Sequence, residues 1–230
     1  MLRLSALYRY PLKSGKVDVL QSVDLDKLGL DGDRRWMLVD EASGRFLTQR
    51  AEAKMSQLSA LWNAQGGLTL SAPQQSSIEI ALPGSDAELR GVTIWRDTLR
   101  VPDAGDEAAR WVSDFIGKPT RLVQVPLDRA RTTPSGVGKD DDQVAFADGF
   151  PLLLIGEASL QDLSQRVGRP LEMLRFRPNL VIEGSEAYAE DGWKRIRIGD
   201  VEFRVVKPCA RCILTTIDPQ TGERSADREP

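Results

Sequence analysis

The chain has 230 residues, of which 41% are hydrophobic and 28% are charged, and its formal net charge at pH 7 is −3. These values are typical of a globular protein with a sizeable core, and they give no general reason to expect a nucleic-acid partner. Two cysteines and no histidine exclude a disulfide-built scaffold, histidine-ligated metal sites, and Ser-His or Cys-His catalytic dyads.

The first half of the chain reads as a series of short strands. Within residues 2–12, apolar and polar side chains alternate with a period near two, which is typical of a strand. Turn residues at 31–33 and 41–44 divide residues 17–50 into further strands. Later strands are predicted at residues 57–63, 68–72, 77–82 and 91–102. Strands at this spacing favour a barrel or sandwich over a parallel sheet with crossover helices.

One helix is predicted in this half, at residues 106–118. Asp106 stands where an N-cap belongs, and Gly117 stands where a C-terminal cap belongs. The helix presents an apolar stripe at i, i+3, i+4 and i+7, formed by Ala108, Trp111, Val112 and Phe115. This stripe indicates a face that packs on the core.

The second half mixes element types. Residues 128–143 are polar and contain Pro and Gly without periodicity, which predicts a surface loop or a domain junction. A helix is predicted at 157–168, ended by Gly168, with its apolar positions facing the core: Leu160, Leu163 and Val167. Strands are predicted at 150–156, 179–184 and 212–218, and as a pair within 193–206 around a Gly199-Asp200 turn.

Both cysteines lie in the stretch "VVKPCARCILTTIDP", between the end of one predicted strand and the start of another. We therefore expect them in a loop at a sheet end. Lys207 and Arg211 flank them, and neighbouring cations favour the thiolate form, which is the nucleophile and the ligand for soft metals.

Four interpretations of these thiols are open. A structural zinc site needs four nitrogen or sulfur ligands, and two thiols without histidine make it very unfavourable. A thioredoxin-like redox pair would open a helix, whereas β-branched residues follow Cys212. In the third interpretation the thiols are buried and inert. In the fourth, one thiolate ligates a metal that an external anionic cofactor carries. The last interpretation requires cationic groups elsewhere in the chain.

Suitable cationic residues stand at predicted strand ends. Lys13 and Ser14 follow a proline bend in "YPLKSG", and Arg34 follows a Gly-Asp turn in "GDRRW". Arg177 precedes a proline that keeps it extended, and Asn179 opens the next strand. Arginine matches phosphate geometry and lysine supplies a point charge. Each residue alone is typical of a solvated surface, but together with the cysteines they indicate a cofactor site.

Six segments resemble, in order, the MOSC family, specifically members with an N-terminal β-barrel domain such as the mitochondrial amidoxime-reducing components and their bacterial relatives. The segments are "YPLKSG", "GLDGDRRWMLVDEASGRFLTQR", "FADGFPLLLIGEASLQDL", "FRPNLVIEG", "YAEDGWKRIRIGDVEF" and "CARCILTTIDPQTGER". The resemblance implies a β-rich α+β fold, with an N-terminal MOSC-type β-barrel domain at 1–125 and a MOSC β-barrel domain with a few peripheral helices at 126–230. Relatives usually continue past "GER", so we expect the second domain to be shortened at its C-terminal end.

The resemblance further implies a mononuclear molybdenum cofactor, Mo-molybdopterin. Cys212 is the implied metal ligand and a catalytic residue, Cys209 is its structural neighbour, and Asp148 lies near the substrate as a second catalytic residue. Thr215 or Thr216 would point inward from a strand, but not both. The implied cofactor-binding residues are Lys13, Ser14, Arg34, Arg177, Asn179, Ala210, Arg211 and Thr215. Pyridoxal phosphate binding is associated with the family only at the level of general description.

The implied reaction is the reduction of N-hydroxylated compounds (hydroxylamines, amidoximes and N-hydroxylated bases) to amines. The four cysteines of a 2Fe–2S module are missing, so electrons would come from a separate protein of flavin reductase, ferredoxin or cytochrome type. Two alternatives stay open: a carrier of molybdenum cofactor or of persulfide sulfur without turnover, and a β-rich binding domain with buried thiols. No apolar run suits a signal peptide or a bilayer span, so we expect a cytoplasmic protein.

Overall fold

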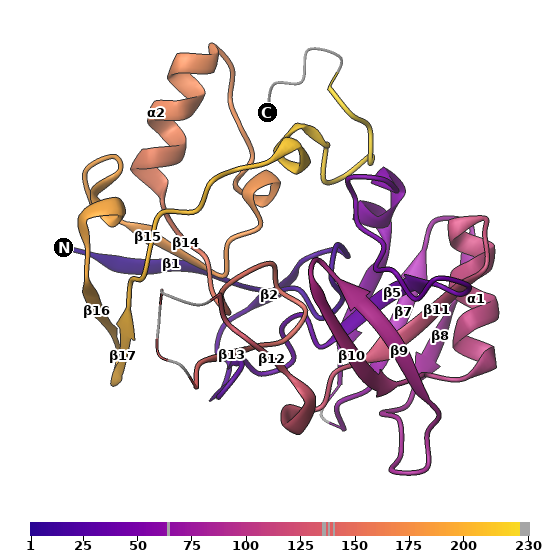
Figure 1. Ribbon diagram of the computed structural model, residues 1–230. Helices are drawn as coiled ribbons and strands as arrows, with labels where there is room; N and C mark the ends of the chain where they lie inside the picture. The colour runs from indigo at the N-terminus through magenta and orange to yellow at the C-terminus, as the bar shows by residue number, and fades with distance from the viewer. Residues whose placement is uncertain (64, 135–136, 138, 140, 226–230) are drawn as a thin grey trace.

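The computed structural model describes residues 1–63, 65–134, 137, 139 and 141–225. Within these residues a four-stranded sheet has the order β14-β15-β1-β2, and a three-stranded sheet has the order β6-β7-β8. The remaining strands form two-stranded ladders (Figure 1). The strands of the first half are β1 (Arg3–Arg9), β2 (Asp18–Leu20), β3 (Leu25–Asp26), β4 (Gly29–Leu30), β5 (Trp36–Asp40), β6 (Ser59–Trp62), β7 (Leu68–Ala72), β8 (Gln75–Ile80), β9 (Leu89–Ile94) and β10 (Asp97–Pro102).

The strands of the second half are β11 (Thr120–Gln124), β12 (Arg131–Thr132), β13 (Gln143–Val144), β14 (Leu154–Gly156), β15 (Leu180–Glu183), β16 (Arg195–Ile198) and β17 (Val201–Arg204). The described residues contain two α-helices, α1 (Asp106–Ile116) and α2 (Glu157–Val167). Short 3-10 helices are η1 (Ala53–Gln57), η2 (Leu127–Arg129), η3 (Met173–Phe176), η4 (Ala189–Gly192) and η5 (Ile213–Thr216). The predicted β-rich α+β class is confirmed. No helix within the described ranges is long and apolar enough to cross a membrane.

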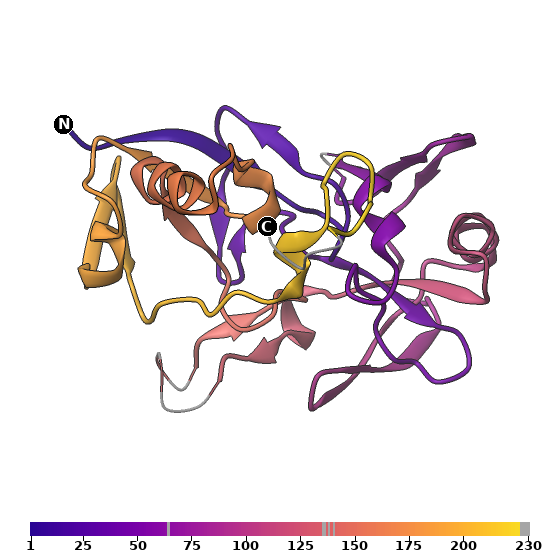
Figure 2. The same ribbon diagram turned by 90° about the horizontal axis from the view of Figure 1, so that it is seen from above.

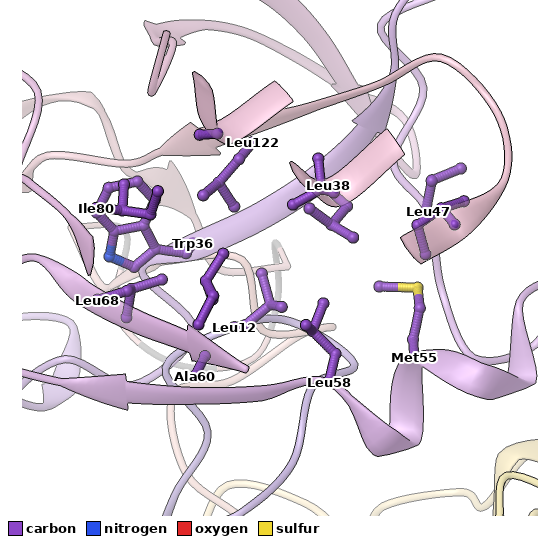
Figure 3. Close-up of a cluster of buried hydrophobic side chains, with 14 residues drawn as sticks. Leu12, Trp36, Leu38, Leu47, Met55, Leu58, Ala60, Leu68, Ile80 and Leu122 are labelled. Carbon is purple, nitrogen blue, oxygen red and sulfur yellow. The ribbon is translucent and has the colours of Figure 1, made fainter. Parts of the chain in front are cut away.

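The ladder of β5 and β11 separates two hydrophobic clusters. Trp36, Leu38 and Leu122 face one cluster, while Met37 and Val123 face the other, because successive side chains of a strand point to opposite faces. Figure 3 shows the first cluster, in which the side chains of β5 and β11 point toward leucines of the neighbouring segments. Burial on both faces explains why β11 was missed from the sequence: its run "TRLVQ" shows no alternation of hydrophobicity.

The predicted helices are present, with one correction at a cap. Asp106 does not cap α1, because the N-cap residue is Gly105 and the Asp106 carboxylate instead accepts a hydrogen bond from Arg121 at 2.8 Å. Gly117 and Gly168 end α1 and α2 in the left-handed conformation, as predicted. The predicted core face of α2 is only partly buried, and a carboxylate from η4 accepts hydrogen bonds at its first turn.

The predicted strand at 212–218 is wrong, because the chain forms the 3-10 helix η5 there. The hydroxyls of Thr215 and Thr216 donate to the carbonyls of Cys212 and Ile213, three residues back, at 3.1 and 2.8 Å. Such local hydrogen bonds compete with strand pairing and overcome the β preference of threonine. The polar loop predicted at 128–143 is tied at its ends by the short pairing of β12 with β13.

The first strand connects the N-terminal half of the chain to the second half. β1 pairs antiparallel with β15 and with β2, so a strand from the N-terminus lies beside one from the second half. In both views of the ribbon, the yellow segment that follows β17 runs from the side of this sheet to the middle of the molecule (Figures 1 and 2). The division at residue 125 stays a prediction.

We predict that Leu38→Ala lowers the free energy of unfolding by about 2–5 kcal/mol, because it leaves a cavity at a fully buried position. Leu61→Ala is the matched control, since Leu61 is 50% exposed and its truncation opens no cavity. Urea unfolding of both variants measures the difference. Equal destabilisation of the two variants would contradict the position of this core.

Candidate functional site

Backbone hydrogen bonds hold Lys13 and Arg34 next to each other. The Lys13 amide donates to the Trp36 carbonyl at 2.8 Å, and the Arg34 amide donates to the Tyr10 carbonyl at 2.8 Å. The Asp33 carboxylate accepts from the Tyr10 amide at 2.8 Å. Residues 10–13 and 33–36 therefore run side by side, and the sequence-predicted residues Lys13 and Arg34 come from this pair of segments.

Asn179 ties a third segment to the same place. Its carbonyl accepts from the Tyr8 amide at 2.8 Å, and its side-chain amide donates to the Tyr8 carbonyl at 3.1 Å. Its side-chain oxygen accepts from Arg34 Nη1 at 2.9 Å and from the Leu153 amide at 3.2 Å. Asn179 is 1% exposed. Its side chain therefore links the Tyr8 and Leu153 backbones to the predicted residue Arg34 within the protein interior.

Three predicted cofactor-binding residues have unusual backbone conformations. Ser14, Arg34 and Arg177 have φ angles of 65°, 48° and 53°, in the left-handed region that side-chain-bearing residues avoid. Such conformations persist only where the surrounding structure imposes them, and they concentrate at functional sites. The prediction that Pro178 keeps Arg177 extended is wrong, because Arg177 follows η3 in the left-handed conformation.

Tyr10 lies between the two predicted arginines. The guanidinium carbons of Arg34 and Arg177 are 4.4 and 4.1 Å from the centre of its ring, within the range of cation–π attraction. Arg177 Nη1 also donates to the Gly15 carbonyl at 2.7 Å. Burial lowers the pKa of Arg177 to about 10 and raises the pKa of Tyr10 to about 12, so the site carries positive charge at neutral pH.

A cavity of about 150 Å³ opens beside this pair. Three buried atoms on its lining residues have no hydrogen-bond partner within the described structure: Tyr10 Oη, Ser56 Oγ and Arg177 Nη2. Lys16 and Arg175 also line it. Unpaired buried polar atoms are rare and costly, and here they combine with positive charge. This donor set suits an anion such as a phosphate group.

A second group of side chains connects Lys13 to a cysteine. Lys13 Nζ donates to Asp148 Oδ1 at 2.6 Å and to the Phe146 carbonyl at 2.7 Å. Arg50 Nη2 donates to Asp148 Oδ2 at 3.1 Å and to Cys212 Sγ at 3.2 Å. The predicted residues Lys13, Asp148 and Cys212 thus form one chain of contacts, completed by Arg50.

Charge and burial set the protonation of this group. Burial lowers the pKa of Lys13 to about 8, although Asp148 opposes the shift. Burial disfavours the charged form of Asp148, but Lys13 and Arg50 outweigh it and hold the pKa of this carboxyl well below its ordinary value. Asp148 is therefore a carboxylate acceptor throughout the neutral range.

Both thiols are exposed, so the interpretation of buried, inert thiols is wrong. The predicted cations are distributed differently from expectation. Arg211 Nη1 lies 3.1 Å from Cys209 Sγ and its Nη2 donates to the Phe176 carbonyl at 2.7 Å, while Lys207 Nζ lies over the Phe150 ring. The cation on Cys212 is instead Arg50, because the loop turns Arg211 back toward η3.

The remaining predicted residues differ in their burial. Thr215 and Thr216 are both buried, which corrects the expectation that only one would point inward, since η5 replaces the strand. Ser14 is buried and its carbonyl accepts from Gln49 Nε2 at 2.9 Å. Ala210 is exposed in the cysteine loop.

Sequence reasoning missed Arg50 and Tyr10. Arg50 ends the quoted segment "GRFLTQR", but nothing in its local pattern points to a thiol 162 residues away. In the sequence, Tyr10 is an ordinary aromatic residue before a proline. Its importance comes from its contacts with the Arg34 and Arg177 guanidinium groups, which are visible only in the folded structure.

The chain matches the MOSC N-terminal beta barrel domain over residues 1–119 and the MOSC domain over residues 141–229. It is 33% identical to mitochondrial amidoxime-reducing component 1 of Danio rerio, over 95% of this chain and 70% of that protein. The Homo sapiens component 1 is 33% identical over 99% and 69%, and the Rattus norvegicus component 2 is 38% identical over 95% and 68%. The chain thus spans roughly two thirds of the length of its curated relatives, between 66% and 70% for the first four.

We predict a pH-dependent contribution of Lys13 to stability. Between pH 8 and about 10.5 the native Lys13 has lost its proton while the unfolded lysine keeps it, so the unfolded state binds more protons. Stability from this group therefore rises with pH, by at most about 1.4 kcal/mol per pH unit. The free energy of unfolding of the wild type minus that of Lys13→Met should increase between pH 7.5 and 9.5.

Urea unfolding at both pH values measures this difference, and Lys27→Met, at an exposed lysine, corrects for the loss of a charge as such. If the difference in unfolding free energy between wild type and Lys13→Met stays constant or falls over this range, burial does not lower the pKa of Lys13.

Proposed function

Because the chain belongs to the MOSC family, with both family domains matched in order, we propose that it is a molybdenum-cofactor-binding oxidoreductase. In this proposal it reduces N-hydroxylated compounds to amines with electrons from a separate donor protein. The relatives described above are amidoxime-reducing components. The observation that carries the proposal is the link from an exposed Cys212 thiol, through Arg50 and Asp148, to a buried cationic cluster.

The residues fit the anionic part of this cofactor. Arg177 Nη2, Tyr10 Oη and Ser56 Oγ are buried atoms without partners among the described residues, and all three residues line one cavity, so a terminal phosphate held there would lie beside unpaired donors. Arg34 and Lys13 lie in neighbouring segments, where Asp33 and Asp148 pair with them, so Arg177 carries the uncompensated positive charge of this cluster. Arginine binds phosphate through charge-assisted hydrogen bonds, and hydroxyl groups add neutral donors.

Cys212 would be the protein ligand of the metal. Its thiol is exposed on a loop, and Arg50 beside it would stabilise the thiolate as a hydrogen-bond donor. Cys209 contacts a different cation, Arg211, so the two thiols have unequal surroundings. When bound, the cofactor supplies the two-electron chemistry of the overall reaction, R–NHOH + 2e⁻ + 2H⁺ → R–NH₂ + H₂O.

The chain's own groups would orient the substrate and hold protons. Asp148 stays ionised, so its carboxylate can accept a hydrogen bond from the N–H or O–H of the substrate. Lys13 Nζ, with a pKa near 8, holds a proton at neutral pH and can exchange it within the working range of general acid–base catalysis.

We predict that Cys212→Ser abolishes reduction of benzamidoxime by reduced methyl viologen. Loss of outer partners of a metal typically costs 10–100-fold, so loss of the ligand itself should cost at least about 100-fold. The protein is made in cells that synthesise the cofactor, and molybdenum and oxidised pterin are measured per chain. Cys209→Ser is the matched control, because it removes a thiol three residues away in the same exposed loop.

Full activity and metal content in Cys212→Ser would disprove the assignment. Loss of function in Cys209→Ser, with molybdenum retained, would instead favour a persulfide carrier.

We predict that Arg177→Met lowers the pterin bound per chain after dialysis by roughly 10-fold, because a buried charged hydrogen bond is worth about 1.5–3 kcal/mol. Arg195→Met, at an exposed arginine on β16, should keep the wild-type content. Fluorescence of the released oxidised pterin measures both, and circular dichroism checks that the variants are folded. Wild-type pterin content in a folded Arg177→Met would remove Arg177 from the cofactor site.

A further inference from the structure

Trp95 stands at the tip of the β9–β10 hairpin. Ile94 pairs with Asp97, so the turn consists of Trp95 and Arg96 alone. Trp95 has a φ of 55° and is 42% exposed. Glycine, asparagine or aspartate usually occupies such a position in a two-residue turn. A bulky aromatic residue there is an outlier, and the turn itself gives no reason for it.

The ring of Trp95 reaches the candidate site. The Arg50 guanidinium lies 4.9 Å from the ring centre, and the same guanidinium contacts Cys212 Sγ and Asp148. The Phe46 ring meets Trp95 edge-on, with centroids 4.9 Å apart. One guanidinium therefore separates an exposed indole from the thiol that we assign as the metal ligand.

Buried contacts fix the hairpin relative to Asp148. Arg131 is buried, and its Nη1 donates to the Asp97 carboxylate at 2.7 Å, directly after the turn. The same guanidinium donates to the carbonyls of Ala145 and Ala147, in the segment that leads to Asp148. Arg131 thus joins the base of the Trp95 turn to the segment that carries the substrate-side carboxylate.

A second exposed apolar residue lies next to the thiol. Ile213 directly follows Cys212 and is exposed. The charged centre formed by Arg50, Asp148 and Cys212 is thus accompanied by two exposed apolar side chains, Trp95 and Ile213. This combination suits a substrate with a polar N-hydroxyl group on a flat apolar body.

We propose that Trp95 is a specificity-determining residue that stacks on the planar ring of aromatic N-hydroxylated substrates, such as aryl amidoximes and N-hydroxylated bases. The inference rests on the proposed function and adds a residue that favours aromatic over aliphatic substrates. Stacking on an aromatic side chain tolerates different rings because every planar ring offers a π face. Aliphatic N-hydroxylated compounds would gain no such contact and would be bound only through the N-hydroxyl group.

The kinetic test compares benzamidoxime with acetamidoxime, using molybdenum-loaded protein and reduced methyl viologen. Trp95→Leu keeps apolar bulk but cannot stack, so kcat/KM for benzamidoxime should fall about 10-fold, mainly through KM, while that for acetamidoxime stays within about twofold. Trp95→Phe should retain most of the preference. Trp193→Leu, at a partly buried tryptophan after η4, is the matched control and should change neither value.

Equal losses on both substrates in Trp95→Leu would mean that Trp95 acts only through Arg50, and unchanged values would mean that it does nothing. Either result overturns the proposal.

A binding measurement separates this inference from the proposed function. In protein labelled with 5-fluorotryptophan, the ¹⁹F resonance of Trp95, identified by its loss in Trp95→Phe, should shift with benzamidoxime and not with acetamidoxime. If the loaded wild type reduces neither compound, the proposed function fails, while this shift still supports a stacking role. Absence of the shift overturns the stacking role, whether or not the enzyme is active.

Discussion

The candidate site depends on burying more positive than negative charge at one point. Lys13, Arg34 and Arg177 come from three segments; backbone hydrogen bonds join the first two segments, and the Arg177 side chain donates to the Gly15 carbonyl. The Tyr10 ring makes cation–π contacts with Arg34 and Arg177. Buried charge of one sign is costly unless a partner compensates it, and the unpaired atoms around the neighbouring cavity show where compensation is incomplete. An anionic ligand is the partner that such an arrangement favours.

Rigid packing makes this arrangement sustainable. The β5–β11 ladder is buried between two hydrophobic clusters and begins directly after the segment that carries Arg34. Left-handed backbone at Ser14, Arg34 and Arg177 would relax if the flanking segments could move. The close-packed core on both faces of the ladder prevents that movement. Close packing of the core thus holds the strained, charged residues in position.

The sequence predicts the cationic side of the site better than the thiol side. Lys13, Arg34 and Asn179 could be found because each stands at a strand end marked by a turn residue or proline, which is local information. The contact of Arg50 with Cys212 depends on the packing of segments 162 residues apart, and no local pattern encodes it. The element after Cys212 was mispredicted for a different, local reason: β-branched threonines favour a strand, but here their hydroxyls donate to carbonyls three residues back. The alternation rule gave the β-rich class, yet it failed for β11, where both faces are buried.

The contacts also explain why the two matched domains occur together. Lys13, Arg34, Arg50 and Trp95 lie within the N-terminal match, whereas Asp148, Arg177 and Cys212 lie within the MOSC match. Arg50 bridges them by contacting both Asp148 and Cys212, and β1 connects them through its pairing with β15. The thiol alone would have no cation from its own loop, since Arg211 contacts Cys209 instead. The chemistry that we propose is therefore a property of the surface between the two matched regions, and each region supplies a part that the other lacks.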